Sequence, residues 1–185
     1  MAVPEWITSS EPYLAPRDPA AADPWREEAA RAGGVGAHKV ILVARQVPSE
    51  RVARLLGLAP DEAAVLRRRL VTLDGVPVEV SDSWYPARVA DGTPLAEDRP
   101  IKGGALRALA ERGYVAERHV EEVAAVEVPA ELSNLLPGTP VIELTRTSYT
   151  ADDVPFEVAV MLMSPEMAPG VPRRLRYEIR YRPDE

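Results

Sequence analysis

Cysteine is absent from the 185-residue sequence, which excludes a disulfide framework, a thiolate zinc site and a cysteine nucleophile. Only two histidines are present, His38 and His119, and neither has a second histidine at ligand spacing. We interpret both as structural or surface residues and expect no metal and no cofactor. No apolar run approaches the roughly 18 residues of a membrane span, and no basic region followed by an apolar stretch opens the chain. We therefore expect a cytoplasmic protein without a membrane partner.

Positive charge is also scarce, because 22 lysines and arginines stand against 29 aspartates and glutamates, a net charge of −7. This balance disfavours direct binding to DNA phosphates, although an acidic protein can carry a local basic patch. The length suits one domain with a small appendage. Residues 1–37 are rich in proline and predict an N-terminal arm with a short helix that begins at Pro24 and is capped by Asp23. Aromatic residues in the arm predict that it docks on the domain or on a neighbouring subunit.

The strongest local signal is Asp74-Gly75 between two runs of valine and leucine, which predicts a β-hairpin. A two-residue loop would mix apolar and charged groups on each side. A three-residue loop, residues 73–75, separates them, and we expect this register because burial selects it. The apolar face then holds Leu66, Leu70, Val76, Val78, Val80 and Trp84. The polar face holds Arg67, Arg69, Glu79, Ser81 and Ser83.

The same pattern occurs again from Leu144 to Val158, where Arg146 corresponds to Arg68 and Glu157 to Glu79. The duplication predicts two related hairpins in one antiparallel sheet covered by helices. The apolar face of the second copy would hold Ile142, Leu144, Val154, Phe156, Val158, Val160 and Leu162. Its polar face would hold Glu143, Thr145, Thr147, Glu157, Ala159, Met161 and Met163.

Several shorter elements are predicted around the hairpins. One helix begins at Glu50 and ends at Gly57, and another follows Gly103-Gly104 and ends at Gly113. Residues 115–128 predict a long strand, residues 129–136 a short helix, and residues 174–181 a strand with one buried face. The Gly103-Gly104 helix start either offers backbone N–H groups to an anion or is an ordinary flexible turn.

If the two polar faces approach each other, two arginines and two glutamates line a concave space. The guanidinium fork suits carboxylate or phosphate, and a carboxylate accepts hydrogen bonds from hydroxyl or amine groups. The mixture favours a small anion of the sugar phosphate or carboxylic acid class. The same face is equally consistent with a solvated sheet surface whose cross-strand salt bridges need no ligand.

Several motifs follow one another along the chain: Arg67-x-Arg69, Asp74-Gly75-Val76-Pro77-Val78-Glu79, Ser83-Trp84-Tyr85-Pro86, Lys102-Gly103-Gly104 and Pro155-Phe156-Glu157. Their order and the duplication resemble the UTRA effector-binding domain of GntR transcription regulators of the HutC subfamily. The resemblance implies an α/β (α+β) fold of the chorismate lyase type, a mostly antiparallel sheet with flanking helices. Residues 38–185 would form this ligand-binding domain, which is usually a homodimer.

The resemblance also implies roles. The two arginines and the helix start would hold an anionic group, the two glutamates would hold hydroxyl groups, and Met163 replaces a tyrosine of sugar-phosphate-sensing members. The predicted ligand-binding residues are Arg67, Arg69, Glu79, Ser81, Ser83, Gly104, Ala105, Glu157 and Met163.

The function implied by the resemblance is a non-enzymatic sensor that passes ligand binding to a DNA-binding domain. The arm is too short for a winged helix-turn-helix, so we expect a stand-alone sensor or one whose start lies within a longer gene. It would act on DNA only indirectly, as a homodimer or as a heterodimer with a full-length GntR-type regulator. The alternatives are a chorismate-lyase-like enzyme with an arginine clamp and a glutamate acid, and an interaction module whose pocket has degenerated.

Overall fold

The computed structural model describes residues 6–14, 23–99, 101, 103–136, 138 and 140–178. Its larger sheet has the strand order β2-β3-β4-β7-β6-β5, and its smaller sheet has the order β1-β9-β8. The strands are β1 (Trp6–Thr8), β2 (Gly36–Gln46), β3 (Ala64–Leu73), β4 (Val76–Pro86), β5 (Arg118–Val126), β6 (Val141–Tyr149), β7 (Pro155–Met163), β8 (Glu166–Ala168) and β9 (Val171–Leu175). The helices and 3₁₀ turns are η1 (Glu11–Tyr13), α1 (Pro24–Arg31), α2 (Glu50–Leu56), α3 (Ala87–Ala90), η2 (Pro94–Ala96), α4 (Gly104–Ala110) and η3 (Ala130–Leu132).

The larger sheet is antiparallel throughout its described strands, and β1 pairs with β9 in parallel. The predicted mostly antiparallel sheet with flanking helices is thus confirmed. The smaller sheet was not predicted. None of the helices in the described ranges is long and apolar enough to cross a membrane.

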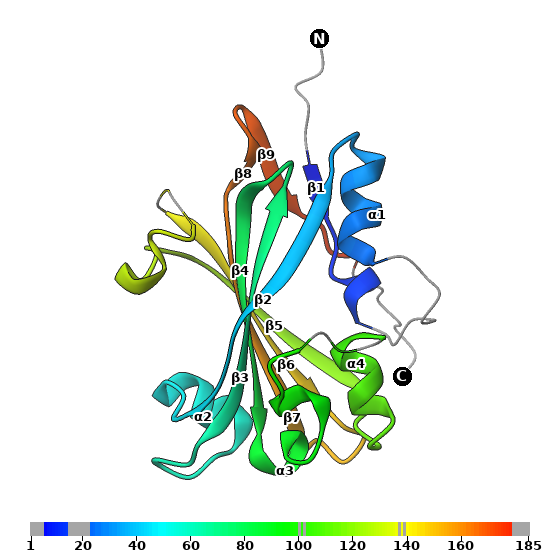
Figure 1. The fold of residues 1–185 in the computed structure, drawn as a ribbon, viewed down its shortest axis with the longest axis vertical. Helices are drawn as coiled ribbons and strands as arrows, with labels where there is room; N and C mark the ends of the chain where they lie inside the picture. Colours follow the sequence, from blue (N-terminus) through cyan, green and yellow to red (C-terminus); the bar gives the residue numbers. More distant parts are fainter. Residues whose placement is uncertain are drawn as a thin grey trace, which may run out of the picture.

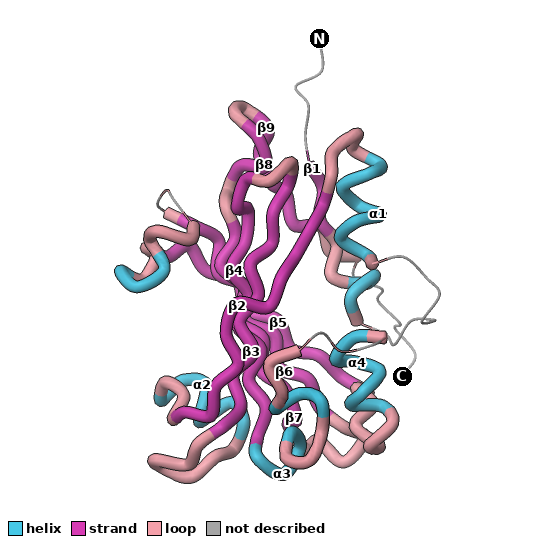
Figure 2. The backbone as a smooth tube through the Cα atoms, in the orientation of Figure 1, coloured by secondary structure: helices cyan, strands magenta, loops and turns pink. Residues whose placement is uncertain are grey.

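Helices lie on both sides of the larger sheet (Figures 1 and 2). We call the side that carries α1 and α4 the front face and the side that carries α2 and η3 the back face. On the front face, Trp25 of α1 packs against Val71 at one end of the sheet, and α3 and α4 pack around Tyr85 at the other end. On the back face, α2 packs against Trp84 and η3 against Val80.

The first hairpin turns over two residues, so the predicted three-residue loop is wrong. Asp74 and Gly75 both have positive φ (50° and 81°), which is the conformation of a tight hairpin turn. A bulge then shifts the pairing, because Thr72 lies opposite Pro77 whereas Val71 lies opposite Glu79. The bulge restores the predicted polar face. Two predicted apolar residues leave their set: Val76 is 59% exposed, and Val78 packs on the front face.

The second hairpin is shifted by one residue relative to the first. Its strands are joined by residues 150–154, with Tyr149 opposite Pro155 and, after a bulge, Ser148 opposite Glu157. Since side chains alternate with a period of two, this shift reverses β6. The predicted faces of β6 are therefore wrong: Ile142, Leu144 and Arg146 face the front, and Glu143, Thr145 and Thr147 face the back. The β7 residues Glu157, Ala159, Met161 and Met163 face the front as predicted, but Val154 is exposed and Phe156 packs on the front.

The helix ends follow the sequence signals closely. Asp23 caps α1 by accepting from the N–H groups of Trp25 and Arg26, and Ser49 caps α2, which ends at Gly57. The predicted helix over residues 129–136 is only the turn η3. The predicted C-terminal strand ends at Leu175 instead, and residues 179–181 lie outside the described residues.

The N-terminal arm docks on the domain. Trp6 and Trp25 share one buried cluster with residues of β3, β4 and β8, and their rings are 5.7 Å apart. The division of the chain at residue 37 remains a prediction, since the arm and the sheet contribute to the same cluster.

Candidate functional site

Strand register gathers the predicted polar side chains on the front face. One row across the sheet runs Arg67, Ser83, Ala159, Arg146, Glu121. The next row runs Arg69, Ser81, Met161, Leu144, Val123. We call these two rows the central rows. They lie between the cluster under α1 and the cluster under α4, and they are crossed by the strands of both hairpins.

The guanidinium group of Arg67 is occupied by hydrogen bonds to the backbone. Its side chain is 5% exposed, and burial lowers its pKa. Nη1 donates to the carbonyl oxygens of Pro94, Leu95 and Glu97, and Nη2 donates to that of Arg99 at 3.0 Å. Arg67 therefore anchors the segment that leads into α4, which makes it a support of one wall of the front face.

The next two arginines differ sharply from each other. Arg68 points to the back face, where Nε and Nη2 each lie 2.7 Å from a carboxylate oxygen of Asp82. Arg69 points to the front face, is half-buried, and donates to Ser81 Oγ at 3.3 Å. Among the described residues, no carboxylate lies within ion-pair distance of Arg69. Of the three consecutive arginines, it is the one with N–H groups available for an anion.

The two glutamates also differ. Arg173 of β9 donates to Glu79 at 3.3 Å and to the carbonyl of Val78, so the smaller sheet occupies Glu79. Met163, opposite Glu79, is 2% exposed. Glu157 is buried and accepts a hydrogen bond from Tyr85 Oη at 2.8 Å. Burial first, and then the charge of Glu157, raises the pKa of Tyr85.

Some polar residues of the front face were missed by the sequence prediction. Arg146 Nε donates to Glu121 at 2.6 Å, and His119 Nδ1 lies 3.1 Å from Ser148 Oγ. Burial, followed by the positive charge of Arg146, lowers the pKa of His119. They were missed because β6 was expected in the reverse orientation. The longer connection at residues 150–154 was the signal that could have revealed it.

The glycine-rich start of α4 serves as a turn in this structure. Gly103 and Gly104 both have a φ of 81°, which other residues adopt only with strain. The Gly104 N–H donates to the carbonyl of Ile101 at 2.9 Å, and Ala105 packs against the cluster around Tyr85. Lys102 lies outside the described residues. The predicted anion contacts at Gly104 and Ala105 therefore remain predictions.

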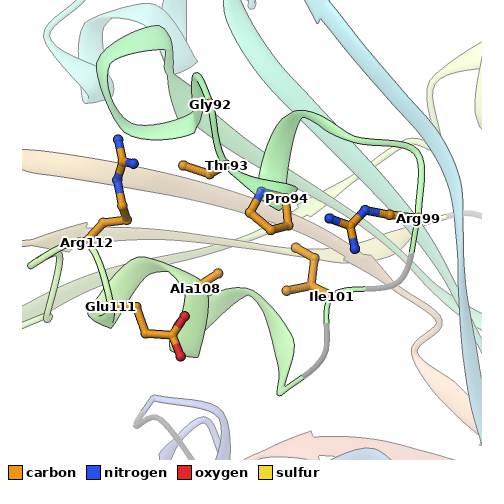
Figure 3. A pocket seen from close by; sticks show the side chains of 8 residues that line it. All are labelled: Gly92, Thr93, Pro94, Arg99, Ile101, Ala108, Glu111 and Arg112. Atoms are coloured by element: carbon orange, nitrogen blue, oxygen red, sulfur yellow. The ribbon is translucent and has the colours of Figure 1, made fainter.

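A pocket of about 210 Å³ lies between α4 and the segment that Arg67 anchors (Figure 3). It is lined by Gly92, Thr93, Pro94, Arg99, Ile101, Ala108, Glu111 and Arg112. Arg99 is paired with Glu97, and the lining contains none of the predicted ligand-binding residues. No group of three or more histidine, aspartate or glutamate side chains within the described part of the chain is placed to hold a metal ion.

The available groups define what the front face can bind. Arg69 offers hydrogen-bond donors and positive charge, Ser81 and Ser83 offer hydroxyl groups, and Glu157 offers an acceptor. These groups match the chemistry of a molecule that carries an anionic group at one end and hydroxyl or amine donors at the other.

Comparison with known proteins identifies the family. The sequence profile of the UTRA domain matches residues 31–168. This chain belongs to the UTRA domain family. It is 30% identical to the ligand-binding domain of a Bordetella bronchiseptica protein assigned to the GntR-family regulators, over 70% of this chain and 83% of that one, with a TM-score of 0.57.

Two further proteins extend the comparison. The chain is 34% identical over 125 residues to an uncharacterized HTH-type transcriptional regulator, SCO4628, of Streptomyces coelicolor. That match covers 64% of this chain and 46% of the regulator, so the chain spans about half the length of its relative. The crystal structure of PhnF from Mycobacterium smegmatis has the same fold, with a TM-score of 0.69 at 19% identity over 96% of this chain and 73% of that one.

Proposed function

We propose that this UTRA domain is the effector-sensing part of a GntR regulator of the HutC type, and that it binds a small anionic metabolite on the central rows. Ligand binding shifts a conformational equilibrium, and a DNA-binding partner reads that shift. Contact with DNA is indirect, in keeping with the net charge of −7. Such a regulator acts where the DNA is, in the cytoplasm.

The observation that carries the proposal is the state of Arg69. A half-buried guanidinium has given up part of its hydration, and burying a charge without an opposite charge is unfavourable. The two neighbouring arginines have strong acceptors: Arg67 donates to four backbone carbonyls, and Arg68 donates to a carboxylate. Arg69 has one long bond to a neutral hydroxyl. A phosphate or carboxylate of a ligand would supply the missing partner.

The position of Glu157 narrows the ligand class. Arg69 lies on β3 and is in line with Met161 of β7, and Glu157 lies four residues further along β7. The two Cα positions are therefore about 16 Å apart, two strands across the sheet and four residues along it. With side chains reaching inward, an anionic group on Arg69 would sit several ångströms from a donor on Glu157. Sugar phosphates and hydroxylated or amino-substituted carboxylic acids have this arrangement of groups.

The partner follows from the family. GntR-type regulators act on paired DNA half-sites, which two-fold symmetric proteins match best. The chain would therefore act as a homodimer or as a heterodimer with a full-length relative. Analytical ultracentrifugation of the chain, alone and mixed with a full-length GntR regulator from the same organism, measures this directly.

A thermal-shift screen against sugar phosphates, amino acids and small aromatic acids tests the ligand. A binding anion should raise the melting temperature of the wild type, and Arg69→Ala should remove most of that rise. Arg68→Ala is the matched control: it lowers the basal melting temperature but should keep the ligand-induced rise, since Arg68 points to the back face.

Two outcomes contradict the proposal. One is a screen without any stabilising anion. The other is a stabilising anion whose effect survives Arg69→Ala unchanged. Turnover of chorismate or a similar acid in the same samples would instead favour the enzyme alternative.

A further inference from the structure

The N-terminal residues 6–14, which we call the strap, run over the front face. Figure 1 shows β1 and the η1 turn on the same side of the sheet as α1 and α4, with η1 between the two helices. β1 is held by its parallel pairing with β9. The strap therefore lies on the side that carries the central rows.

The strap is bonded to elements from opposite edges of the larger sheet. Tyr13 Oη donates to Glu28 of α1 at 2.7 Å, and α1 packs on the edge strand β2. Ser10 Oγ donates to Glu121 of the other edge strand, β5, at 3.0 Å. Residues only three apart thus bridge the two sides of the front face, above the central rows.

The two attachments are unequal. On the α1 side, one carboxylate of Glu28 accepts from Trp6, Thr8 and Tyr13, and Trp6 is buried against Trp25. On the β5 side, the hydrogen bond of the strap among the described residues is that of the Ser10 hydroxyl, and η1 buries none of its residues. The α1 side is therefore the more strongly held end of the strap.

Glu121, the acceptor for Ser10, is itself a residue of the central rows. It accepts from Arg146 at 2.6 Å and from Ser10 at 3.0 Å. Burial acts to raise the pKa of Glu121, but the positive charge of Arg146 and the hydrogen bonds that Glu121 accepts outweigh it, so its pKa is lowered and the carboxylate stays charged. Ser10 therefore bonds to an ion, which makes its hydrogen bond stronger than a neutral one.

The central rows form the floor beneath the strap, and several of their side chains are closed to solvent in this conformation. Ser81 is fully buried, Ser83 is 5% exposed and Ala159 is 7% exposed. A ligand cannot touch these side chains until whatever covers them moves. The strap crosses this face and is held at its β5 end by the Ser10–Glu121 hydrogen bond.

We propose that the strap gates the ligand face, and that the Ser10–Glu121 hydrogen bond is the catch that keeps it closed. This inference rests on the proposed ligand site but adds its regulation: release of Ser10 exposes the central rows, and the position of the N-terminal segment reports whether the face is open.

The absence of cysteine gives a direct test that needs no ligand. Ala159→Cys places a single thiol on the floor between Ser83 and Arg146, and its rate of reaction with N-ethylmaleimide measures opening. Adding Ser10→Ala should speed labelling roughly tenfold, the effect expected from loss of one hydrogen bond to a charged group. Ser10→Thr keeps the hydroxyl and should label like the parent.

Ser133→Ala is the matched control, because it deletes the hydroxyl of the residue that follows η3, on the back face, where its hydrogen bond is to the Ala130 carbonyl. It should leave labelling unchanged. Hydrogen exchange gives a second readout: Ser10→Ala should lower the protection of residues 6–14 while α1 keeps its own. Equal labelling rates for Ser10→Ala and the parent, with unchanged exchange, would overturn the gate.

The result separates the gate from the ligand proposal. If the catch controls labelling but the anion screen yields no ligand, the gate stands and the proposed ligand fails. If an anion binds through Arg69 but Ser10→Ala does not change the labelling rate, the ligand proposal stands and the gate fails.

Discussion

The two hairpins of this UTRA domain share a sequence pattern but show opposite sides of their first strand. In β3–β4 the turn is two residues long, and Arg67 and Arg69 face the front. In β6–β7 the connection covers residues 150–154, and the matching Thr145 and Thr147 face the back, where Arg51 of α2 donates to Thr145 at 3.0 Å. A one-residue difference in register decides which side chains of a repeat face the front.

The bulges show what the two copies preserve. Each hairpin has a bulge just before its glutamate, so Val78 and Phe156 pack on the front and Glu79 and Glu157 follow them there. Glu79 then pairs with Arg173, whereas Glu157 pairs with the neutral Tyr85. The duplication conserves the bulge before the glutamate, while the partner of that glutamate differs between the copies.

The largest expected difference between the copies is in stability. Arg67→Ala should cost about 3 kcal/mol of unfolding free energy, because four carbonyls lose a charged donor near the core. Thr145→Ala, the same position in the second copy, should cost about 1 kcal/mol, since it removes one hydroxyl contact with Arg51. Urea denaturation measures both. Equal losses would contradict the supporting role of Arg67.

The turns should differ by a smaller amount. Gly75→Val places a β-branched side chain at a φ of 81° and should cost about 1–2 kcal/mol. A Cβ at Gly75 would meet no atom within 4 Å, so this cost is backbone strain alone. Asp153, at a φ of 56°, lies in the second connection, and Asp153→Gly should be neutral or slightly stabilising in the same urea assay. A destabilising Asp153→Gly would show that this side chain matters more than its backbone.

The smallest effect concerns the histidines that flank the two hairpins. Burial is the main cause that lowers the pKa of His38, beside β3, and of His119, beside β6. The unfolded chain therefore takes up protons near the ordinary value of 6.5 while the folded chain does not, and stability is lost as the pH falls below about 6.5. His38→Gln with His119→Gln should flatten this loss between pH 7.5 and 5.5. If the double variant loses stability with falling pH as steeply as the wild type, the loss comes from carboxylates instead.

Much of the fold could be predicted from local chemistry. The caps Asp23 and Ser49, the Asp74-Gly75 turn and the alternation in β4 and β7 each specify structure within a few residues. The smaller sheet could not be predicted, because β1 and β8 are three residues long and carry no periodic pattern. The face of β6 depended on the length of one connection, which residue types alone do not fix.

The face shared by the candidate residues could be predicted, but the partners of their side chains could not. Alternation placed Arg69, Ser81, Ser83 and Glu157 on one face, where the structure has them. It could not show that Arg67 binds carbonyls, because every residue has a backbone oxygen and the side-chain pattern does not indicate which of them, here in residues 94–99, accept a hydrogen bond. Nor could it show that Arg173, distant in sequence, pairs with Glu79.

The most direct test of this account is an NMR titration that observes the Nε–Hε signals of the arginines. Inorganic phosphate, or an anion found in the thermal-shift screen, is added to the wild-type chain, and Arg67→Lys, Arg68→Lys and Arg69→Lys assign the signals. The account predicts a saturable shift of the Arg69 signal, with those of Arg67 and Arg68 nearly still. A saturable shift of Arg67 with a stationary Arg69 would contradict it.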